Sequence, residues 1–260
     1  MNKKAERIER ILHILKKQGA AGIKELAHLL DVTEMTIRRD LLELSEKKLT
    51  KVLHGGAIYT SPDKSTQNSE KVYSYSEEST KHQTEKDRIG RKAASMVVPH
   101  DTIIIDTGTT TEYLAKHLRD DMPLTALAYA LNIINEICFR VNFNQIIAGG
   151  TFYKNTLSFV GSTGIELIKR IRASKVFISA SGVSDTLGIM STNLYEIEIK
   201  NAAINSSHTR VLLVDSSKFD QVKIAHFADI QDFDIIITDT GVPPRYIDIA
   251  KNLGVMMYCV

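Results

Sequence analysis

The first sixty residues carry three apolar stripes with helical spacing. Apolar side chains that recur three or four positions apart lie on one face of a helix. The positions are Ile8, Ile11, Leu12 and Leu15, then Ile23, Leu26, Ala27 and Leu30, and finally Ile37, Leu41 and Leu44. The pattern predicts three short amphipathic helices that share one small core.

The helix with the third stripe has the features of a recognition helix. Residues 31–32 supply a tight turn, and Thr33 is a favourable N-cap after it. At about 100° per residue, Met35 and Arg39 point away from the buried stripe, with Thr36 and Arg38 on its flanks. The first residues of such a helix contact base edges in helix-turn-helix proteins, and Arg and Thr bind either bases or phosphates. The pattern predicts a helix-turn-helix whose partner is double-stranded DNA.

A hairpin is predicted after this helix. Residues 49–58 mix β-branched and apolar side chains around Gly55 and Gly56, as the wing of a winged helix does. Lys51 and His54 are the candidates there for contact with the sugar-phosphate backbone. The expected domain limits are therefore 1–58 for a DNA-binding domain, 59–83 for a polar linker, and 84–260 for a second domain. Tyr73 and Tyr75 are the aromatic residues of the expected linker that can dock on a neighbouring surface.

From Glu85 onward, short apolar runs alternate with helical segments. The expected strands are 102–105, 124–128, 145–148, 175–180, 211–214, 235–238 and 255–259. The expected helices between them include 110–118, 133–140, 164–171, 195–206 and 245–253. Such alternation predicts an α/β domain with a mostly parallel sheet covered on both faces. Ligands of these sheets bind at the carboxyl ends of the strands.

Polar loops follow several of the expected strands. Residues 106–111 (DTGTTT) open a helix, so their amides, hydroxyls and helix dipole are suited to a phosphate, and Gly108 permits close approach. Gly149, Gly150 and Gly182 also follow strands, and each is as consistent with an ordinary turn as with ligand contact. Lys218 follows another strand and is suited either to a phosphate or to solvent. The convergence of these loops predicts a pocket.

Two further alternatives concern charged residues. Glu196 and Lys200 are four positions apart on one expected helix, where they would form a surface ion pair. Asp106 would cap the helix that follows it. Both of these structural roles stay open as alternatives to a role in ligand binding.

Composition narrows the class of protein. The chain has 260 residues, 43% hydrophobic and 25% charged, which is typical of a globular protein with two domains. Residues 1–58 contain 12 Lys and Arg against 8 Asp and Glu, whereas the rest contains 21 against 23, so the excess of positive charge lies where phosphate contact is predicted.

No apolar run reaches the length of a membrane span, and a cytoplasmic location is expected. The chain has two cysteines, Cys138 and Cys259, which is too few for a disulfide framework or a zinc site. Both are expected to be buried as small apolar side chains. No cofactor is predicted.

The N-terminal motif resembles that of the DeoR family, whose members are repressors of bacterial sugar operons. The resemblance rests on residues 33–41 (TEMTIRRDL) and 54–57 (HGGA). It departs from the family in the wing, where Val52 replaces the usual basic residue and Lys51 lies one position earlier.

The second half resembles the DeoR sensor domain, which implies a fold like ribose-5-phosphate isomerase and a phosphorylated-sugar effector. The resemblance implies phosphate-loop roles for Asp106, Gly108, Thr109 and Thr110. It also places Glu196, Lys200 and Lys218 on the family's charged positions. Residues 125–132 (TALAYALN) are most similar to the deoxyribonucleoside-repressor branch, which makes Tyr129 and Asn132 further effector-binding candidates.

The favoured hypothesis is a homo-oligomeric repressor that a sugar phosphate controls, and not an enzyme. One alternative is a sugar-phosphate isomerase-like enzyme with an added DNA-binding domain, because Asp106, Glu196 and Lys218 provide acid-base groups. Another is a general architectural DNA binder, which would have nearly sequence-independent affinity.

Overall fold

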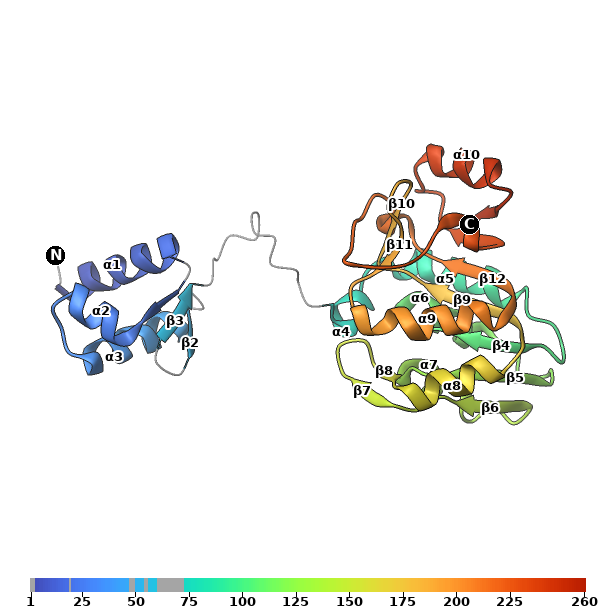
Figure 1. The fold of residues 1–260 in the computed structure, drawn as a ribbon, viewed down its shortest axis with the longest axis horizontal. Helices are drawn as coiled ribbons and strands as arrows, with labels where there is room; N and C mark the ends of the chain where they lie inside the picture. The colour runs from blue at the N-terminus through green and yellow to red at the C-terminus, as the bar shows by residue number, and fades with distance from the viewer. Residues whose placement is uncertain (1–2, 19, 47–49, 54–55, 60–72) are drawn as a thin grey trace. The chain divides into compact units, whose positions relative to one another are not determined.

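The chain folds into two units, residues 1–70 and 71–260 (Figure 1). The structure is a computed structural model that describes residues 3–18, 20–46, 50–53, 56–59 and 73–260. None of the helices in these ranges has the length and apolarity that a membrane span requires.

The first unit contains three helices and a small antiparallel sheet. Its elements are α1 (Lys3–Gln18), β1 (Ala20–Gly22), α2 (Ile23–Leu29), α3 (Glu34–Glu46), β2 (Thr50–Leu53) and β3 (Gly56–Tyr59). The three predicted stripes form one core, in which Ile11, Leu26 and Ile37 are fully buried. The predicted hairpin forms from β2 and β3. Strand β1, which the sequence pattern did not predict, pairs with the other edge of β3.

The second unit is built on a sheet of seven parallel strands. In order across the sheet they are β15 (Met256–Cys259), β14 (Ile235–Thr238), β12 (Ser207–Leu213), β9 (Ala173–Ser179), β4 (Thr102–Ile105), β5 (Leu124–Ala128) and β6 (Phe143–Ile147). Every neighbouring pair is parallel. The predicted α/β class is confirmed, and the bounds of β4, β5 and β14 agree with the predicted ranges.

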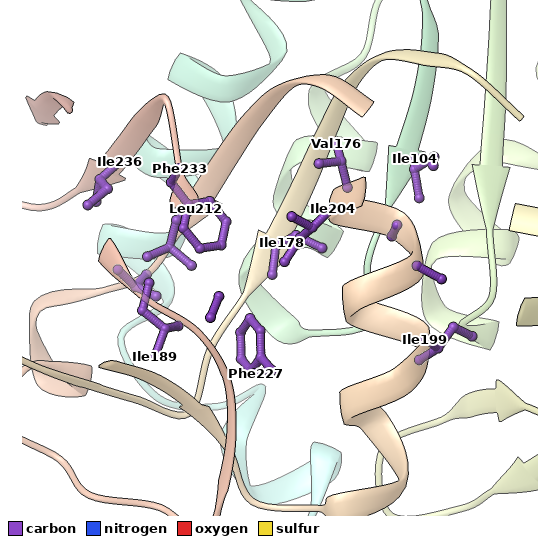
Figure 2. Close-up of a cluster of buried hydrophobic side chains, with 14 of the residues drawn as sticks. Ile104, Val176, Ile178, Ile189, Ile199, Ile204, Leu212, Phe227, Phe233 and Ile236 are labelled. Atoms are coloured by element: carbon purple, nitrogen blue, oxygen red, sulfur yellow. The ribbon is translucent and has the colours of Figure 1, made fainter. Parts of the chain in front are cut away.

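Helices cover both faces of this sheet. The helices are α5 (Gln83–Ala94), α6 (Thr109–His117), α7 (Leu131–Ile137), α8 (Ser162–Arg170), α9 (Ile197–Asn205) and α10 (Pro244–Asn252). One core cluster joins α5, α6 and α7 to Ile103 and Ile105 of β4. A second joins α8, α9 and α10 to Ile104, which points the other way because successive side chains of a strand alternate between faces. Figure 2 shows part of this second cluster, including Ile104 and Ile199 of α9. In the sequence, a strand that is buried on both faces is therefore a continuous run of apolar residues.

Smaller elements surround the parallel sheet. They are the hairpin of β7 (Thr151–Tyr153) and β8 (Ser158–Val160), the antiparallel sheet of β10 (Gly182–Ser184), β11 (Gly188–Ser191) and β13 (Ala225–Ala228), the short helix α4 (Tyr75–Glu78), and the 3-10 turns η1 (Leu194–Glu196), η2 (Ser216–Lys218) and η3 (Ile230–Asp232). The helix α4 lies in the segment expected to be linker. It belongs to the second unit, where the Tyr75 hydroxyl donates a hydrogen bond to Glu112 of α6.

Candidate functional site

The outward face of α3 is the candidate site of the first unit. Thr33 caps the helix, because its Oγ1 accepts a hydrogen bond from the amide of Thr36 at 3.3 Å. Met35 is 61% exposed, and Arg39 is exposed on the same side. The guanidinium of Arg38 lies 3.9 Å from Glu34, with both side chains about half exposed. The residues predicted to contact DNA thus form an accessible surface at the start of α3.

The two wing candidates are less fully described. Lys51 lies in β2, opposite Ile58 of β3, but its side chain is outside the described part of the structure. His54 also lies outside the described residues. Their contact with phosphate stays a prediction.

A cavity of about 250 Å³ opens at the carboxyl ends of the central strands in the second unit. The strand β4 is the first of the sheet in chain order, yet it lies between β9 and β5. The chain therefore builds the sheet outward in two directions from β4, and this reversal leaves a crevice where ligands of parallel sheets bind. The cavity is lined by Tyr73, Ser74, Glu77, Glu78, Lys81, Thr107, Gly108, Thr109, Thr110, Thr156, Ser179, Ala180, Ser181, Ser191, Thr192, Glu196, Lys200, Ser217, Lys218, Gln221 and Lys223.

A buried ion pair forms the floor of the cavity. The Lys200 Nζ of α9 lies 2.5 Å from Oδ2 of Asp106 at the end of β4, and the two side chains are 2% and 0% exposed. Lys200 also donates to the carbonyl oxygen of Ser179 at 3.0 Å. Asp106 accepts further hydrogen bonds from the Tyr129 hydroxyl at 2.5 Å and the Ser179 amide at 2.8 Å. A buried carboxylate needs such complete pairing.

These contacts contradict two alternatives raised by the sequence, the helix cap at Asp106 and the surface ion pair of Glu196 and Lys200. Asp106 does not cap α6, because its carboxylate is turned beneath the loop toward Tyr129, Ser179 and Lys200. Glu196 and Lys200 do not form a surface pair, since both side chains are buried and Lys200 pairs with Asp106.

The loop before α6 faces the cavity with hydroxyl groups and backbone. Gly108 has a φ of +147°, and a Cβ there would lie 2.4 Å from the Ser179 Oγ, so both the backbone conformation and the close packing require glycine. Asn132 supports the loop from behind by donating to the Gly108 carbonyl at 3.1 Å. Thr109 begins α6, and Thr109 and Thr110 line the cavity, where the positive end of the helix dipole would favour an anion.

Glu196 also lines the cavity. It is 4% exposed and accepts hydrogen bonds from the Ser191 hydroxyl and from the Asn193 amide nitrogen at 3.0 Å. Burial raises the pKa of this carboxyl group, although the charge of Lys200 and the two hydrogen bonds oppose the rise. Glu196 therefore offers the cavity a carboxyl oxygen suited to a hydroxyl of a ligand.

The segment around α4 forms one wall. The Glu78 carboxylate pairs with Lys218 of η2 and lies 3.1 Å from the Lys81 Nζ. The Lys86 Nζ donates to the Glu78 carbonyl oxygen at 2.7 Å, and burial lowers the pKa of this lysine. Several ammonium groups therefore gather on this side of the cavity.

Two sequence families match the chain. The DeoR-like helix-turn-helix domain covers residues 7–63, and the DeoR C terminal sensor domain covers residues 81–240. The chain belongs to the DeoR family. It is a DNA-binding transcriptional regulator with a C-terminal sensor domain, as the resemblance predicted.

Named relatives of this DeoR-family regulator match along nearly all of their length. The deoxyribose operon repressor of Escherichia coli strain K12 is 31% identical over 257 residues, which cover 98% of this chain and 99% of that protein. The lactose phosphotransferase system repressor of Staphylococcus epidermidis is 31% identical and covers 92% of this chain and 93% of that protein. Both are named as repressors and not as enzymes.

Solved structures show a more distant likeness. A ribose 5-phosphate isomerase A from Methanocaldococcus jannaschii aligns with a TM-score of 0.40 and 12% identity, over 53% of this chain and 54% of that chain.

The structure brings only some of the regulator's predicted effector residues to the cavity surface. Gly108, Thr109, Thr110, Glu196, Lys200 and Lys218 line it. Asp106, Tyr129 and Asn132 lie beneath the surface as supports. Gly149, Gly150 and Gly182 do not line it. A Cβ at Gly150 would lie 2.5 Å from the Val160 backbone, and one at Gly182 would lie 2.3 Å from the Gln221 carbonyl oxygen, so these two serve close backbone packing.

The side chains that α4 and the neighbouring strands contribute to the cavity were not predicted from the sequence. Tyr73, Glu78 and Lys81 precede the predicted domain, and the one available signal was the pair of tyrosines in an otherwise polar segment. The expected burial of both cysteines was also wrong. Cys138 is half-buried and Cys259 is exposed, since it ends β15 at the edge of the sheet.

Proposed function

We propose that this regulator represses a carbohydrate-utilisation operon and that a phosphorylated sugar in the cavity of the sensor domain controls it. The observation that carries the proposal is the composition of the cavity. One part presents the amide end of α6 with Thr109 and Thr110, another presents Lys218, and the remainder presents hydroxyl and carboxyl groups. A phosphate suits the first two and a polyhydroxylated chain suits the last.

A phosphate has three possible cationic neighbours in this cavity besides the buried Lys200. They are Lys81, Lys218 and Lys223. Lys200 is already neutralised by Asp106, so its charge is not free to balance a ligand. Lys218 pairs with Glu78, but its side chain is 17% exposed rather than fully buried, so a ligand in the cavity can reach its ammonium. Lys218, which lines the same cavity as the start of α6, is therefore the proposed phosphate anchor.

The proposed DNA contacts are Thr33, Met35, Thr36, Arg38 and Arg39 on α3, with Lys51 and His54 in the wing. Helix-turn-helix proteins generally bind as dimers to two half-sites, and the chain is proposed to act as a homo-oligomer in the same way. A ligand changes operator affinity only if it binds the DNA-free and DNA-bound forms with different affinity. The sugar phosphate is proposed to favour the free form.

A ligand screen on the full-length protein tests this function. Ribose 5-phosphate, deoxyribose 5-phosphate, glucose 6-phosphate and galactose 6-phosphate are compared with their unphosphorylated sugars by thermal shift. At least one phosphate should raise the melting temperature, and it should weaken binding to a duplex selected by the protein from random DNA at fixed salt. The proposal is refuted if no phosphorylated sugar changes either quantity.

A turnover assay with the same compounds separates sensing from catalysis. The sensor should bind its ligand and return it unchanged. Conversion of the bound sugar phosphate to an isomer would instead support the isomerase-like alternative.

A further inference from the structure

The cavity already contains an anion that belongs to the chain. The carboxylate of Glu78, the last residue of α4, pairs with Lys218, and the two side chains are 15% and 17% exposed. The Lys81 Nζ lies 3.1 Å from Oε2 of the same carboxylate. All three residues line the cavity. The proposed phosphate anchor is therefore occupied by an internal carboxylate.

The carboxylate of Glu78 is charged over the whole physiological range. Burial alone would raise its pKa, but the hydrogen bonds and charges of Lys218 and Lys81 outweigh burial and lower the pKa to about 2. A phosphate monoester carries between one and two negative charges near neutral pH. Two anions on one ammonium repel each other, and the repulsion is strong where water is scarce. A phosphate and Glu78 thus compete for Lys218.

Helix α4 is short. The helix has four residues, none of them fully buried. Apart from those of Glu78, its contacts to the rest of the sensor domain include two hydrogen bonds of Tyr75: the amide donates to the Asn155 carbonyl oxygen at 2.8 Å, and the hydroxyl donates to Glu112. Among the described residues, it is also the first helix of the second unit in chain order.

We propose that Glu78 is an affinity-setting residue of the ligand site: it occupies Lys218 in the free protein, and a phosphorylated ligand must displace it, which releases α4. This inference rests on the proposed function, because it assumes that the cavity binds a phosphate. It goes further by naming the internal competitor and the element that ligand binding moves. No covalent step is involved.

Inorganic phosphate is the probe for the test, because it carries the shared chemistry of all candidate ligands. Its affinity for the full-length protein is measured by isothermal titration calorimetry at constant ionic strength. The Glu78→Gln variant should bind phosphate roughly tenfold more tightly than the wild type, since the competing charge is gone. Glu166→Gln is the matched control. It removes the same charge from an exposed ion pair with Lys169 on α8 and should leave the affinity unchanged.

Further variants test whether phosphate and Glu78 compete at Lys218. Lys218→Gln should weaken phosphate binding, and adding Glu78→Gln to it should restore little, because the site of competition has been removed. Glu78→Asp, with a shorter side chain that withdraws the carboxylate from Lys218, should give an intermediate affinity. This variant keeps the test valid if Glu78→Gln folds poorly.

Hydrogen exchange of a peptide covering residues 73–81 provides a readout that does not depend on affinity. Exchange should rise in the wild type when phosphate is added, and it should already be raised in Glu78→Gln without phosphate. If the wild type binds phosphate but Glu78→Gln binds it no more tightly and residues 73–81 exchange equally in both, the competition is refuted while the proposed function stands. If neither protein binds phosphate or any of the sugar phosphates above, both are refuted.

Discussion

Replacing Lys200 by methionine removes the cation from the buried pair beneath the cavity and keeps the length of the side chain. Asp106 would keep its hydrogen bonds from Tyr129 and Ser179 but would lose the ammonium at 2.5 Å. Since the two side chains are 2% and 0% exposed, water cannot replace that ammonium without disturbing the core. Removing one partner of a buried pair typically costs about 3–5 kcal/mol.

The expected change is large enough to measure by thermal unfolding. For a domain of this size, about 3–5 kcal/mol corresponds to a fall of roughly 6–20 °C in melting temperature. The chain has nine tyrosines and no tryptophan, and of the tyrosines only Tyr59 lies in the first unit, so the near-ultraviolet circular dichroism of tyrosine reports mainly on the second unit. The assay can therefore use the full-length protein.

Lys169→Met is the matched control. Lys169 pairs with Glu166 at 2.9 Å, but its side chain is 49% exposed and that of Glu166 is 58% exposed. Exposed pairs contribute only about 0–1 kcal/mol. A difference of about 2–4 °C in melting temperature corresponds to roughly 1 kcal/mol in the free energy of unfolding. If Lys200→Met melts within about 2–4 °C of Lys169→Met, the Asp106–Lys200 pair does not contribute the stability expected of a buried pair.

Three further predictions concern other parts of the chain. Arg39→Ala should weaken binding to the selected DNA duplex by about 1–3 kcal/mol in fluorescence anisotropy and leave phosphate affinity unchanged; equal affinity of variant and wild type for that duplex would contradict the recognition-helix assignment. Gly108→Ala should lose about 1–3 kcal/mol of stability because of its φ of +147° and the contact with Ser179, whereas Gly149→Ala, with no atom within 4 Å of its Cβ, should not. The folded-state pKa of Glu78 is lowered from 4.5 to about 2, so its ion pair stabilises the protein above pH 4.5 and is lost as the pH falls toward 2. The difference in melting temperature between wild type and Glu78→Gln should shrink over that interval, and a constant difference would show that the charge of Glu78 is not its cause.

The strands of the parallel sheet were predictable because burial on both faces leaves a simple signal. The apolar run of β4 gave its limits directly, as did that of β14. The strand β12 instead begins at Ser207, four residues before the apolar run, because its pairing with β9 continues through polar residues up to Ser207 opposite Ala173. Backbone pairing of this kind leaves no mark on the pattern of side chains.

Helix α5 and the short antiparallel strands were missed for a different reason. Of the twelve residues of α5, only Ile89 and Ala93 are buried apolar side chains, so its stripe is too sparse to recognise. The strands β10 and β11 have three and four residues, too few to establish a period.

The cavity was predictable only where it is built from loops that directly follow strands. Gly108 and Lys218 come from such loops and were found. The partner of Lys218 is Glu78, which is 140 residues away in the sequence, and Lys200 is 94 residues from Asp106. No local pattern connects residues so far apart, so these pairings could only come from the three-dimensional structure.

The Asp106–Lys200 pair also limits how this protein can acquire a preference for another metabolite. Because both side chains of that pair are buried, replacing either residue is expected to damage folding before it alters recognition. The side chains of Glu78, Lys81 and Lys218 are only partly buried and lie outside the parallel sheet, so their replacement is expected to disturb the fold less. Diversification of ligand choice, in nature or by directed evolution, is accordingly expected to concentrate on the α4 wall and on the residues after β12.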